Sequence, residues 1–421
     1  MFSGDRRRIE RKHCSNQESR DAVAIIGSMA TVEIVSRAAT RPTWAEVSLA
    51  NLRHNFRAVQ RHVGAGVTIC AVVKADAYGH GATECARTLE DEGATWLGVT
   101  SLDEAIPLRG AGIRANILLM TGFWRGEEEE IIRLGLTPTV WECEQIDLLE
   151  GAAARMGVAK HPIHLKVDSG MGRLGVCVDE LPAICSQLKQ AGHLVLDGLS
   201  THLASSEVLD APSVPSQLSA FAEARAILTR QRLQPNYIHA ANTGAIISRS
   251  ETWNNMVRPG IALYGYYLPF ERAGREVSGS NLRLEVKPVL TWKTRILSLR
   301  EARANQALGY GGTYVTKAPA RIAVLPVGYA DGLNRKLSSE GRVIVREHYA
   351  PIVGRISMDL TLVDVTDLDG VSVGDEVILL GSLDGLSVDA REHAALSETV
   401  LYEILCGISK RVPRRHGISS K

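Results

Sequence analysis

The chain has 421 residues, which is long for a single core and favours two domains. Hydrophobic residues make up 45% of it and charged residues 23%, a composition typical of a soluble globular enzyme. The 48 Lys and Arg residues almost balance the 47 Asp and Glu residues, leaving a formal net charge of +1. So small a charge produces no long-range field of one sign, so we expect neither nucleic acid nor a membrane surface as a partner.

The first 40 residues have no regular pattern. Arginines at positions 6–8 precede an apolar patch at 22–30, but the polar residues 16–21 separate the two, so the segment is a poor signal peptide. We expect residues 1–40 to be a disordered or overextended N-terminal segment, with Met29 as a candidate initiator. No apolar run in the sequence approaches the roughly 18 residues of a membrane span.

The seven cysteines are scattered, odd in number and form no C-x-x-C pair. This pattern indicates free thiols in a cytoplasmic protein rather than a disulfide framework or a zinc site, and no metal site is expected.

From about residue 44, short apolar runs alternate with helical patterns. Strands are predicted at 67–73, 95–99, 116–120, 138–141, 163–167, 196–200, 237–239 and 256–258, and helices at 82–92, 102–109, 127–134, 146–156, 181–190 and 217–232. Strands and helices that alternate with short connections indicate parallel βαβ units. About eight repeats between residues 65 and 265 favour a (β/α)8 barrel over an open sheet, and we assign residues 41–283 to this barrel.

Past about residue 284 the pattern changes to short, β-branched runs bounded by turns. These runs lie at 289–300, 321–327, 342–347, 351–355, 361–365 and 376–380, and a helix at 393–404 follows. We expect residues 284–421 to form a C-terminal, mainly β domain with a terminal helix. The fold class is therefore α/β plus β.

Polar residues follow the predicted barrel strands, where a barrel of this kind places its catalytic groups. Lys74 follows the first strand, residues 166–173 the fifth, His202 the sixth and Asn242 the seventh, while Arg258 ends the eighth. A buried ammonium is costly, and an amine at a barrel mouth is well placed to form an imine with an aldehyde cofactor. A salt bridge at the barrel rim is the alternative interpretation of Lys74.

The segment around Lys74, AVVKADAYGHGA, resembles the cofactor-attachment motif of alanine racemases. Eight further matches follow in the family's order: LKVDSGMGRLG, STHLA, HAANTG, VRPGIALYG, GYGGTY, VGYADG, GRISMD and RVPR. Together they extend over roughly residues 42–416, and nine motifs in order are far more specific than one.

The resemblance implies that Lys74 binds pyridoxal 5'-phosphate covalently and acts as the base for the D-enantiomer. It implies that Tyr310 is the base for the L-enantiomer and is contributed across the interface of a homodimer. Two bases on opposite faces are what racemisation needs, because removing a proton on one side and returning it on the other inverts the centre. His202 and Arg258 are expected to ease proton loss from Tyr310, whose reference pKa is about 10.

Arg258 resembles the family residue that faces the pyridine nitrogen of the cofactor. A guanidinium donates hydrogen bonds but holds its protons, so it does not readily protonate the ring. The cofactor then is a weaker electron sink, which favours prompt reprotonation over transamination.

The resemblance assigns the other site residues by position. It implies phosphate contacts from Tyr78, Thr243, Gly260 and Ile261 with Asn242 nearby, substrate contacts from Arg173 and Met358, and an access channel lined or supported by Tyr329, Arg335, Arg355 and Asp359. Lys166 matches a lysine that is often carbamylated in this family, and the resulting negative charge would orient Arg173. Lys410 departs from the family pattern, because many members have there a tyrosine that contacts the phosphate and narrows the entrance. The substrate range stays open at this point.

The activity implied is the interconversion of L-alanine and D-alanine, supplying D-alanine for peptidoglycan in a bacterial cytoplasm. A broad-spectrum or serine racemase is the first alternative. A barrel decarboxylase of basic amino acids is less favoured, because those enzymes usually place an acidic residue where this chain has Arg258. A non-catalytic carrier of pyridoxal phosphate is also less favoured, because a carrier has no need of Tyr310 and Met358.

Overall fold

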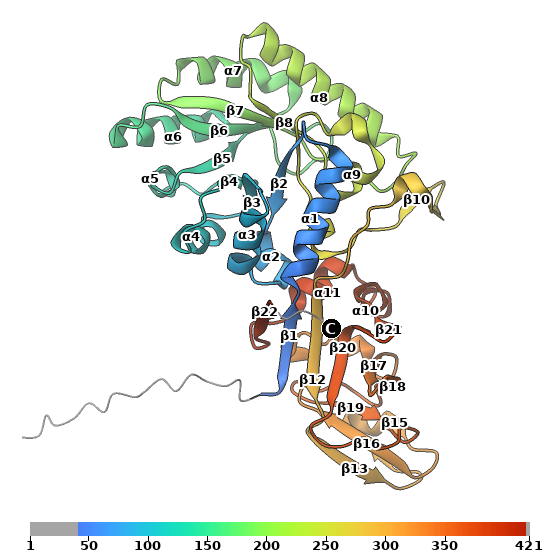
Figure 1. Cartoon of the computed structure of the whole chain (residues 1–421). Coiled ribbons are helices and arrows are strands. Elements are labelled where there is room, and N and C mark those ends of the chain that lie inside the picture. Colours follow the sequence, from blue (N-terminus) through green and yellow to red (C-terminus); the bar gives the residue numbers. More distant parts are fainter. Residues whose placement is uncertain (1–40, 418–421) are drawn as a thin grey trace, which may run out of the picture. The chain divides into compact units, whose positions relative to one another are not determined.

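Eight parallel strands form the first layer of the fold. In the computed structural model, which describes residues 41–417, their order is β9-β2-β3-β4-β5-β6-β7-β8, and every neighbouring pair is parallel (Figure 1). The strands are β2 (Thr68–Val72), β3 (Trp96–Val99), β4 (Asn116–Leu119), β5 (Leu136–Val140), β6 (His161–Lys166), β7 (Leu194–Ser200), β8 (Tyr237–His239) and β9 (Met256–Val257). The Arg258 N–H donates to the Ala241 carbonyl at 3.0 Å where β8 and β9 approach each other, so the barrel is nearly closed. The predicted (β/α)8 barrel is confirmed. The expectation for residues 1–40 lies outside the described residues.

Helices connect the strands and cover the outside of the barrel (Figure 1). They are α1 (Leu49–Val63), α2 (Lys74–Gly79), α3 (Ala82–Asp91), α4 (Leu102–Gly110), α5 (Glu128–Arg133), α6 (Cys143–Met156), α7 (Leu181–Gln190), α8 (Ser213–Arg230) and α9 (Thr243–Ser248). α1 shows why such segments are helical: its buried residues include Leu52, Phe56, Val59 and Val63, which recur every three or four positions on one face. Ser48 caps its first turn by accepting from the Asn51 N–H at 3.2 Å.

β1 (Thr43–Val47) belongs to the second domain's sheet. It pairs antiparallel with β12 (Leu290–Arg295) and parallel with β22 (Arg414–His416). Residues 43–47, assigned to the barrel in the sequence analysis, thus lie in a sheet whose other strands come from the last third of the chain.

The rest of the second domain is mainly β, as predicted. One sheet has the order β18-β17-β20-β12-β1-β22, with β21 beside β20, and a second has the order β13-β16-β19. The other strands of these two sheets are β13 (Ser298–Ala302), β16 (Ala320–Leu325), β17 (Arg342–Val345), β18 (His348–Pro351), β19 (Thr361–Asp364), β20 (Glu376–Leu383) and β21 (Leu386–Val388). The run 351–355 shares only its first residue with β18, so most of that predicted strand is wrong.

The predicted helix at 393–404 is two helices, α10 (Ala390–Leu396) and α11 (Leu401–Gly407). Glu398 between them has a φ of 55°, a left-handed conformation that interrupts a right-handed helix. After this break, α11 packs against α2 of the barrel. The two helices are in close contact, since a Cβ on Gly79 would lie 2.4 Å from the Leu405 carbonyl oxygen. The second domain thereby contributes to the wall of the site described next.

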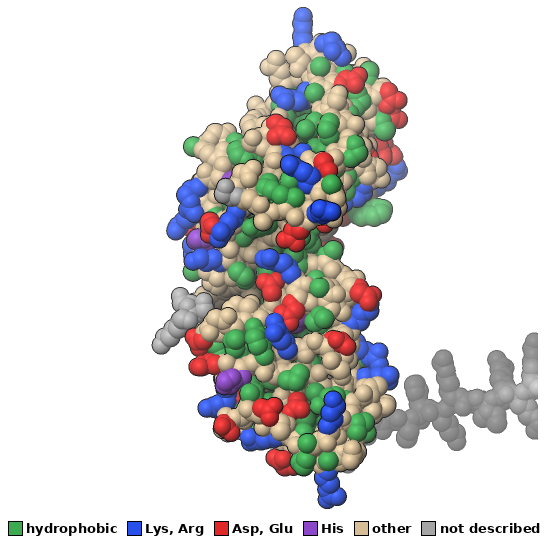
Figure 2. All heavy atoms as spheres, turned by 90° about the vertical axis from the view of Figure 1, so that its right-hand side faces the viewer, with side chains coloured by type: hydrophobic (Ala, Val, Ile, Leu, Met, Phe, Trp, Pro, Cys, Tyr) green, Lys and Arg blue, Asp and Glu red, His purple; other side chains and the backbone are tan. Residues whose placement is uncertain are grey.

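Surface properties agree with the balanced composition. Figure 2 shows basic and acidic side chains interspersed over one face, with no area of a single sign. Within residues 41–417, no helix is long and apolar enough to cross a bilayer.

Candidate active site

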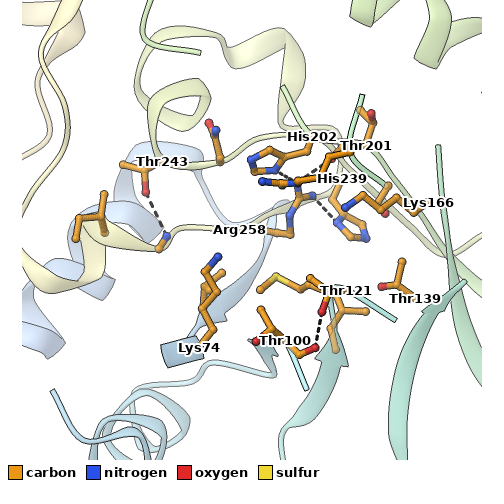
Figure 3. Close-up of a pocket in the computed structure, with 18 of the residues that line it drawn as sticks. Lys74, Thr100, Thr121, Thr139, Lys166, Thr201, His202, His239, Thr243 and Arg258 are labelled. Carbon is orange, nitrogen blue, oxygen red and sulfur yellow. Dashed lines mark hydrogen bonds between the residues drawn. The ribbon is translucent and has the colours of Figure 1, made fainter. Parts of the chain in front are cut away.

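A cavity of about 290 Å³ opens at the carboxyl ends of the barrel strands (Figure 3). The structure brings together here ten residues that the sequence analysis singled out: Lys74, Tyr78, Lys166, Arg173, His202, Asn242, Thr243, Arg258, Gly260 and Ile261. They come from segments spread over almost 190 positions, yet each follows a strand of the same barrel. The carboxyl ends of parallel strands meet at one end of the barrel, which is why these residues converge.

Lys74 lies on a strained turn. The four residues after it, from Ala75 to Tyr78, have φ between 52° and 54°, so they form one turn of left-handed helix without a glycine. Such a turn costs about 1–2 kcal/mol per residue. Glu104 helps to hold it, because its carboxylate accepts from the Ala75 N–H at 2.6 Å and from the Thr100 N–H at 2.7 Å. The strain therefore fixes the direction in which Lys74 leaves the strand.

Burial of the Lys74 ammonium lowers its pKa, and the Arg173 guanidinium lowers it further. The Glu104 carboxylate acts in the opposite direction. The neutral amine is the form that attacks a carbonyl and the form that accepts a proton. The surroundings thus favour the reactive form of this lysine.

Arg258 is a buried cation held by neutral acceptors. Its Nη1 donates to His239 Nδ1 at 2.6 Å, and its Nη2 donates to the Thr201 carbonyl at 2.8 Å and lies 3.3 Å from His202 Nδ1. Burial lowers the Arg258 pKa to about 10, which leaves it protonated at neutral pH. A guanidinium has five N–H donors, so the second Nη1–H and the Nε–H stay available to a molecule in the cavity. In Figure 3 the Lys74 amine points toward the side of the cavity where Arg258 lies.

A small polar cradle lies beside Tyr78. Thr243 Oγ1 accepts from the Gly260 N–H at 3.2 Å, and Asn242 caps α9 by accepting from the Ala245 N–H at 3.1 Å. A Cβ at position 260 would lie 2.3 Å from the Tyr78 hydroxyl oxygen. Only glycine therefore lets the backbone at 260 and the Tyr78 hydroxyl face the same space. Hydroxyls and backbone N–H groups gathered in this way suit an anion such as phosphate.

Arg173 ends a loop organised by Asp168. The Asp168 carboxylate accepts from the N–H groups of Gly170, Met171, Gly172 and Arg173 at 2.8 to 3.1 Å. Burial alone would raise the Asp168 pKa, but these four bonds lower it. Lys166, at the start of the same loop, has its pKa lowered to about 8 by burial, by Arg258 and by Arg173. A fraction of Lys166 is therefore an uncharged amine at neutral pH.

Glu207, His239 and Tyr402 are among the cavity-wall residues to which the sequence motifs assigned no role. Tyr402 comes from α11 of the second domain, and its ring centroid lies 6.2 Å from that of Tyr78. Lys410 is exposed and does not line the cavity. The tyrosine near the cradle is Tyr402, eight positions before Lys410. The doubt that Lys410 placed on the substrate range does not apply to the cavity wall.

The other predicted site residues lie on the second domain, away from the cavity wall of the same chain. They are Tyr310, Tyr329, Arg335, Met358, Arg355 and Asp359. All six are exposed, Tyr310 to 71% and Met358 to 52%. Arg355 lies beside the Tyr310 turn, because its Nη1 would be 3.0 Å from a Cβ on Gly311. The loops of Tyr329 and Met358 are tied together by a 3.0 Å bond from the Tyr329 N–H to the Ser357 carbonyl.

A desolvated lysine at the carboxyl end of a barrel strand, with an anion cradle beside it, defines an enzyme whose chemistry depends on an amine nucleophile. Comparison with known proteins gives the family. Residues 47–268 match the family model described as "Alanine racemase, N-terminal domain", and residues 289–416 match "Alanine racemase, C-terminal domain". The chain belongs to the alanine racemase family.

Individual relatives agree over nearly the whole chain. The alanine racemase of Halothermothrix orenii is 40% identical over 377 residues, 90% of this chain and 97% of the relative. Among solved structures, alanine racemase of Clostridium difficile 630 superposes with a TM-score of 0.82 at 33% identity, covering 90% of this chain and 96% of that one. Alanine racemase from Bartonella henselae with covalently bound pyridoxal phosphate has a TM-score of 0.77 at 30% identity, covering 89% and 99% of the two chains.

Proposed function

We propose that this protein interconverts L-alanine and D-alanine with pyridoxal 5'-phosphate as its cofactor. The observation that carries the proposal is the position of Lys74: a desolvated amine at the carboxyl end of β2, in a cavity that also holds the buried Arg258 after the neighbouring strand β9. The names of the relatives point to the same reaction and substrate.

The residues of the cavity fit this cofactor. Lys74 supplies the amine that would bind its aldehyde covalently. The cradle of Tyr78, Thr243, Gly260 and Ile261 would hold the phosphate, and the space left by Gly260 is where a side chain would block it. A free N–H of Arg258 would meet the pyridine nitrogen as a donor. When bound, the cofactor withdraws electrons from the substrate Cα and so acidifies its proton.

The chain's own groups then have distinct tasks in the proposed reaction. Lys74 accepts the Cα proton on one face as a neutral amine and returns it as the ammonium. Arg173 anchors the substrate carboxylate, a bidentate pairing that suits a guanidinium. The opposite face needs a second base, and we assign that role to Tyr310 of a second copy, with Met358 beside it. The support is that both side chains are exposed and absent from the cavity wall of their own chain.

Lys166 is proposed to carry a carbamate. Its neutral amine would bond to the carbon of carbon dioxide and release one proton, leaving a negative group near Arg173. The lowered pKa supports this step, because only the uncharged amine reacts. Protein equilibrated with 13C-bicarbonate should show one carbamate carbon resonance that disappears in Lys166→Ala. A spectrum without that resonance, or one unchanged by the substitution, would contradict the proposal.

We place the reaction in the cytoplasm, where D-alanine would enter peptidoglycan synthesis. The support is the scattered cysteine pattern and the family, and the six described cysteines are free thiols.

The test is a coupled assay in which an enantioselective oxidase detects D-alanine formed from L-alanine, run with added pyridoxal phosphate. Lys74→Ala should lose at least about a thousandfold in kcat, since it removes both cofactor attachment and one base. Lys317→Ala, at an exposed lysine of the second domain, is the matched control and should keep full activity. Serine, lysine and arginine are assayed beside alanine. Faster turnover of any of these would favour the broad-spectrum or serine racemase, and no turnover of any would overturn the proposal.

A further inference from the structure

Next to Arg258, the buried His239 lines the cavity, and a second buried histidine, His164, contacts His239 but does not line the cavity. Arg258 Nη1 donates to His239 Nδ1 at 2.6 Å, and His239 Nε2 lies 2.9 Å from His164 Nδ1. His164 is 0% exposed and His239 1%. The proposed reaction uses neither imidazole directly, so the presence of this buried pair needs another explanation.

The chemistry of the three groups fixes every proton in this series. A guanidinium only donates, so His239 Nδ1 must accept and carries no proton. Burial lowers the His239 pKa well below its usual value, so that ring is neutral and its single proton is on Nε2. That N–H can only donate to His164 Nδ1. Burial lowers the His164 pKa to about 3, so its own proton is on Nε2.

The surroundings of His164 support one orientation of its ring. A Cβ on Gly198 of β7 would lie 2.4 Å from three atoms of the ring, so this glycine leaves the space in which the imidazole lies. The Trp96 ring also packs against the imidazole, with centroids 5.2 Å apart. His164 Nε2 has no hydrogen-bond partner, but Asp197 Oδ2 is 4.0 Å away, and a carboxylate there favours a proton on Nε2.

We propose that His164 is a positioning residue: by accepting from His239 it fixes the tautomer that holds Arg258 in place. The inference rests on the proposed function, because Arg258 matters there as a donor that keeps its protons. With the opposite tautomer, His239 would present an N–H to the Arg258 N–H, and the guanidinium would turn away. The free N–H donors of Arg258 would then no longer face the cavity.

The expected result of losing this series is a change in reaction specificity. If Arg258 is displaced, the proton can return to the cofactor carbon instead of the substrate Cα. The alanine nitrogen would then stay on the cofactor as an amine, and one water would supply the keto oxygen as the substrate leaves as pyruvate. Pyruvate released per racemisation turnover is therefore the diagnostic quantity.

Two substitutions at one position separate positioning from packing. In His164→Asn the side-chain oxygen can take the place of Nδ1 as an acceptor, whereas His164→Leu fills similar space without one. We expect the Leu variant to release at least about tenfold more pyruvate per turnover, the effect of one lost hydrogen bond, and the Asn variant to stay near the wild type. Trp96→Phe, which changes the packing but not the bonds, is the control and should also resemble the wild type.

Selective 15N labelling of histidine in the loaded enzyme gives a readout that does not depend on turnover. In the wild type and the Asn variant, one ring with Nδ1 unprotonated and Nε2 protonated should be assignable to His239, and this pattern should be lost in the Leu variant. A protonated His239 Nδ1 in the wild type would overturn the tautomer assignment even if no variant folds. Equal pyruvate release from the Leu and Asn variants would overturn the positioning role. A wild type that does not racemise alanine would instead refute the proposed function.

Discussion

At the scale of single residues, the placement of Arg173, the proposed substrate-binding arginine, depends on the loop that carries it. The backbone of Arg173 is held by the hydrogen bond from its N–H to Asp168 Oδ2, at 3.1 Å. Three more N–H groups of the loop converge on Oδ1 of the same carboxylate. Gly175 closes the loop at a φ of 133°, where a Cβ would lie 2.3 Å from the Asp168 nitrogen. One carboxylate thus organises the whole segment.

Replacing Asp168 with Ala should loosen this loop and misplace Arg173. The expected result is a KM for alanine at least about tenfold higher and a loss of about 1 kcal/mol in stability, since four N–H donors lose their acceptor but three of them lie in exposed residues that water reaches. Asp168→Asn keeps one acceptor oxygen, so its KM and its stability should lie between those of the wild type and those of Asp168→Ala. Steady-state kinetics and thermal unfolding measure both effects. Asp369→Asn, at an exposed carboxylate, is the control.

The same carboxylate predicts a pH dependence of stability. Because the folded-state pKa of Asp168 is lowered, its charge stabilises the fold above the unfolded-state pKa of about 3.9, and this contribution is lost as the pH falls through the folded value. The difference in unfolding free energy between the wild type and Asp168→Asn should therefore shrink below about pH 4. A difference that stays constant down to pH 3 would contradict this role.

Sequence motifs found the residues that line the cavity but not those that position them. Lys74, Arg173 and Arg258 stand in motifs with a fixed relation to a strand end. Glu104 bonds to Ala75, 29 positions away, and His164 bonds to His239, 75 positions away. A local sequence motif does not predict such distant pairs. Tyr402 was missed for the same reason, because only the break between α10 and α11 brings it to the cradle.

At the scale of elements, the left-handed turn after Lys74 is the least ordinary segment of the barrel. Its residues Ala75, Asp76 and Ala77 carry Cβ atoms in a conformation that favours glycine. Asp76 also connects the turn to the next helix, since its Oδ1 accepts from the Ala82 N–H at 2.7 Å at the start of α3. The turn is thus bounded on one side by the lysine and on the other by a helix cap.

Ala75→Gly should stabilise the protein, against the usual effect of glycine. Relief of the left-handed strain, about 1–2 kcal/mol, exceeds the added backbone entropy of glycine, about 0.5–1 kcal/mol, so a gain of up to about 1 kcal/mol is expected. Ala75 is exposed, so no packing is lost. Ala154→Gly, at an exposed position of the right-handed helix α6, should instead cost about 1 kcal/mol. Thermal unfolding compares them, and equal destabilisation of both would mean that the turn is not left-handed in solution.

The sequence predicted the elements of the barrel better than those of the second domain. Buried parallel strands are continuous apolar runs, so 67–73 and 95–99 are close to β2 and β3. Residues 43–47 were assigned to the barrel domain and no strand was predicted there, because the partners of β1 lie about 250 and 370 positions away. Run 289–300 was read as one strand, whereas β12 and β13 belong to two different sheets, a division that hydrophobicity alone does not show.

At the scale of the whole molecule, the proposed reaction needs a group that the cavity of one chain does not supply. The cavity wall has a base on one face, Lys74, while Tyr310 lies exposed on the second domain. Tyr329, Met358 and Leu360 are also exposed on the second domain, and we expect a partner to cover this area. A symmetric dimer would bring this area of each copy to the barrel mouth of the other and complete two sites at once.

Mixing two inactive variants tests this arrangement. Lys74→Ala lacks the first base and Tyr310→Phe the second, so each homodimer alone should be nearly inactive. In a mixed dimer one site receives both lesions, but the other combines the intact Lys74 of one copy with the intact Tyr310 of its partner. Random exchange makes about half of the dimers mixed with one working site each, so about a quarter of wild-type activity should return.

No activity should return if Lys74 and Tyr310 act within one chain, because every chain in the mixture then has one lesion in its own site. The variants are mixed, unfolded together and refolded, and each is also refolded alone to correct for recovery. Sedimentation of the refolded samples confirms that dimers formed. Dimers without restored activity would refute the shared site, and restoration without dimers would refute the symmetric arrangement. Lys317→Ala mixed with Tyr310→Phe is the control: about half of wild-type activity is expected whether or not the copies exchange, so it corrects for losses on refolding.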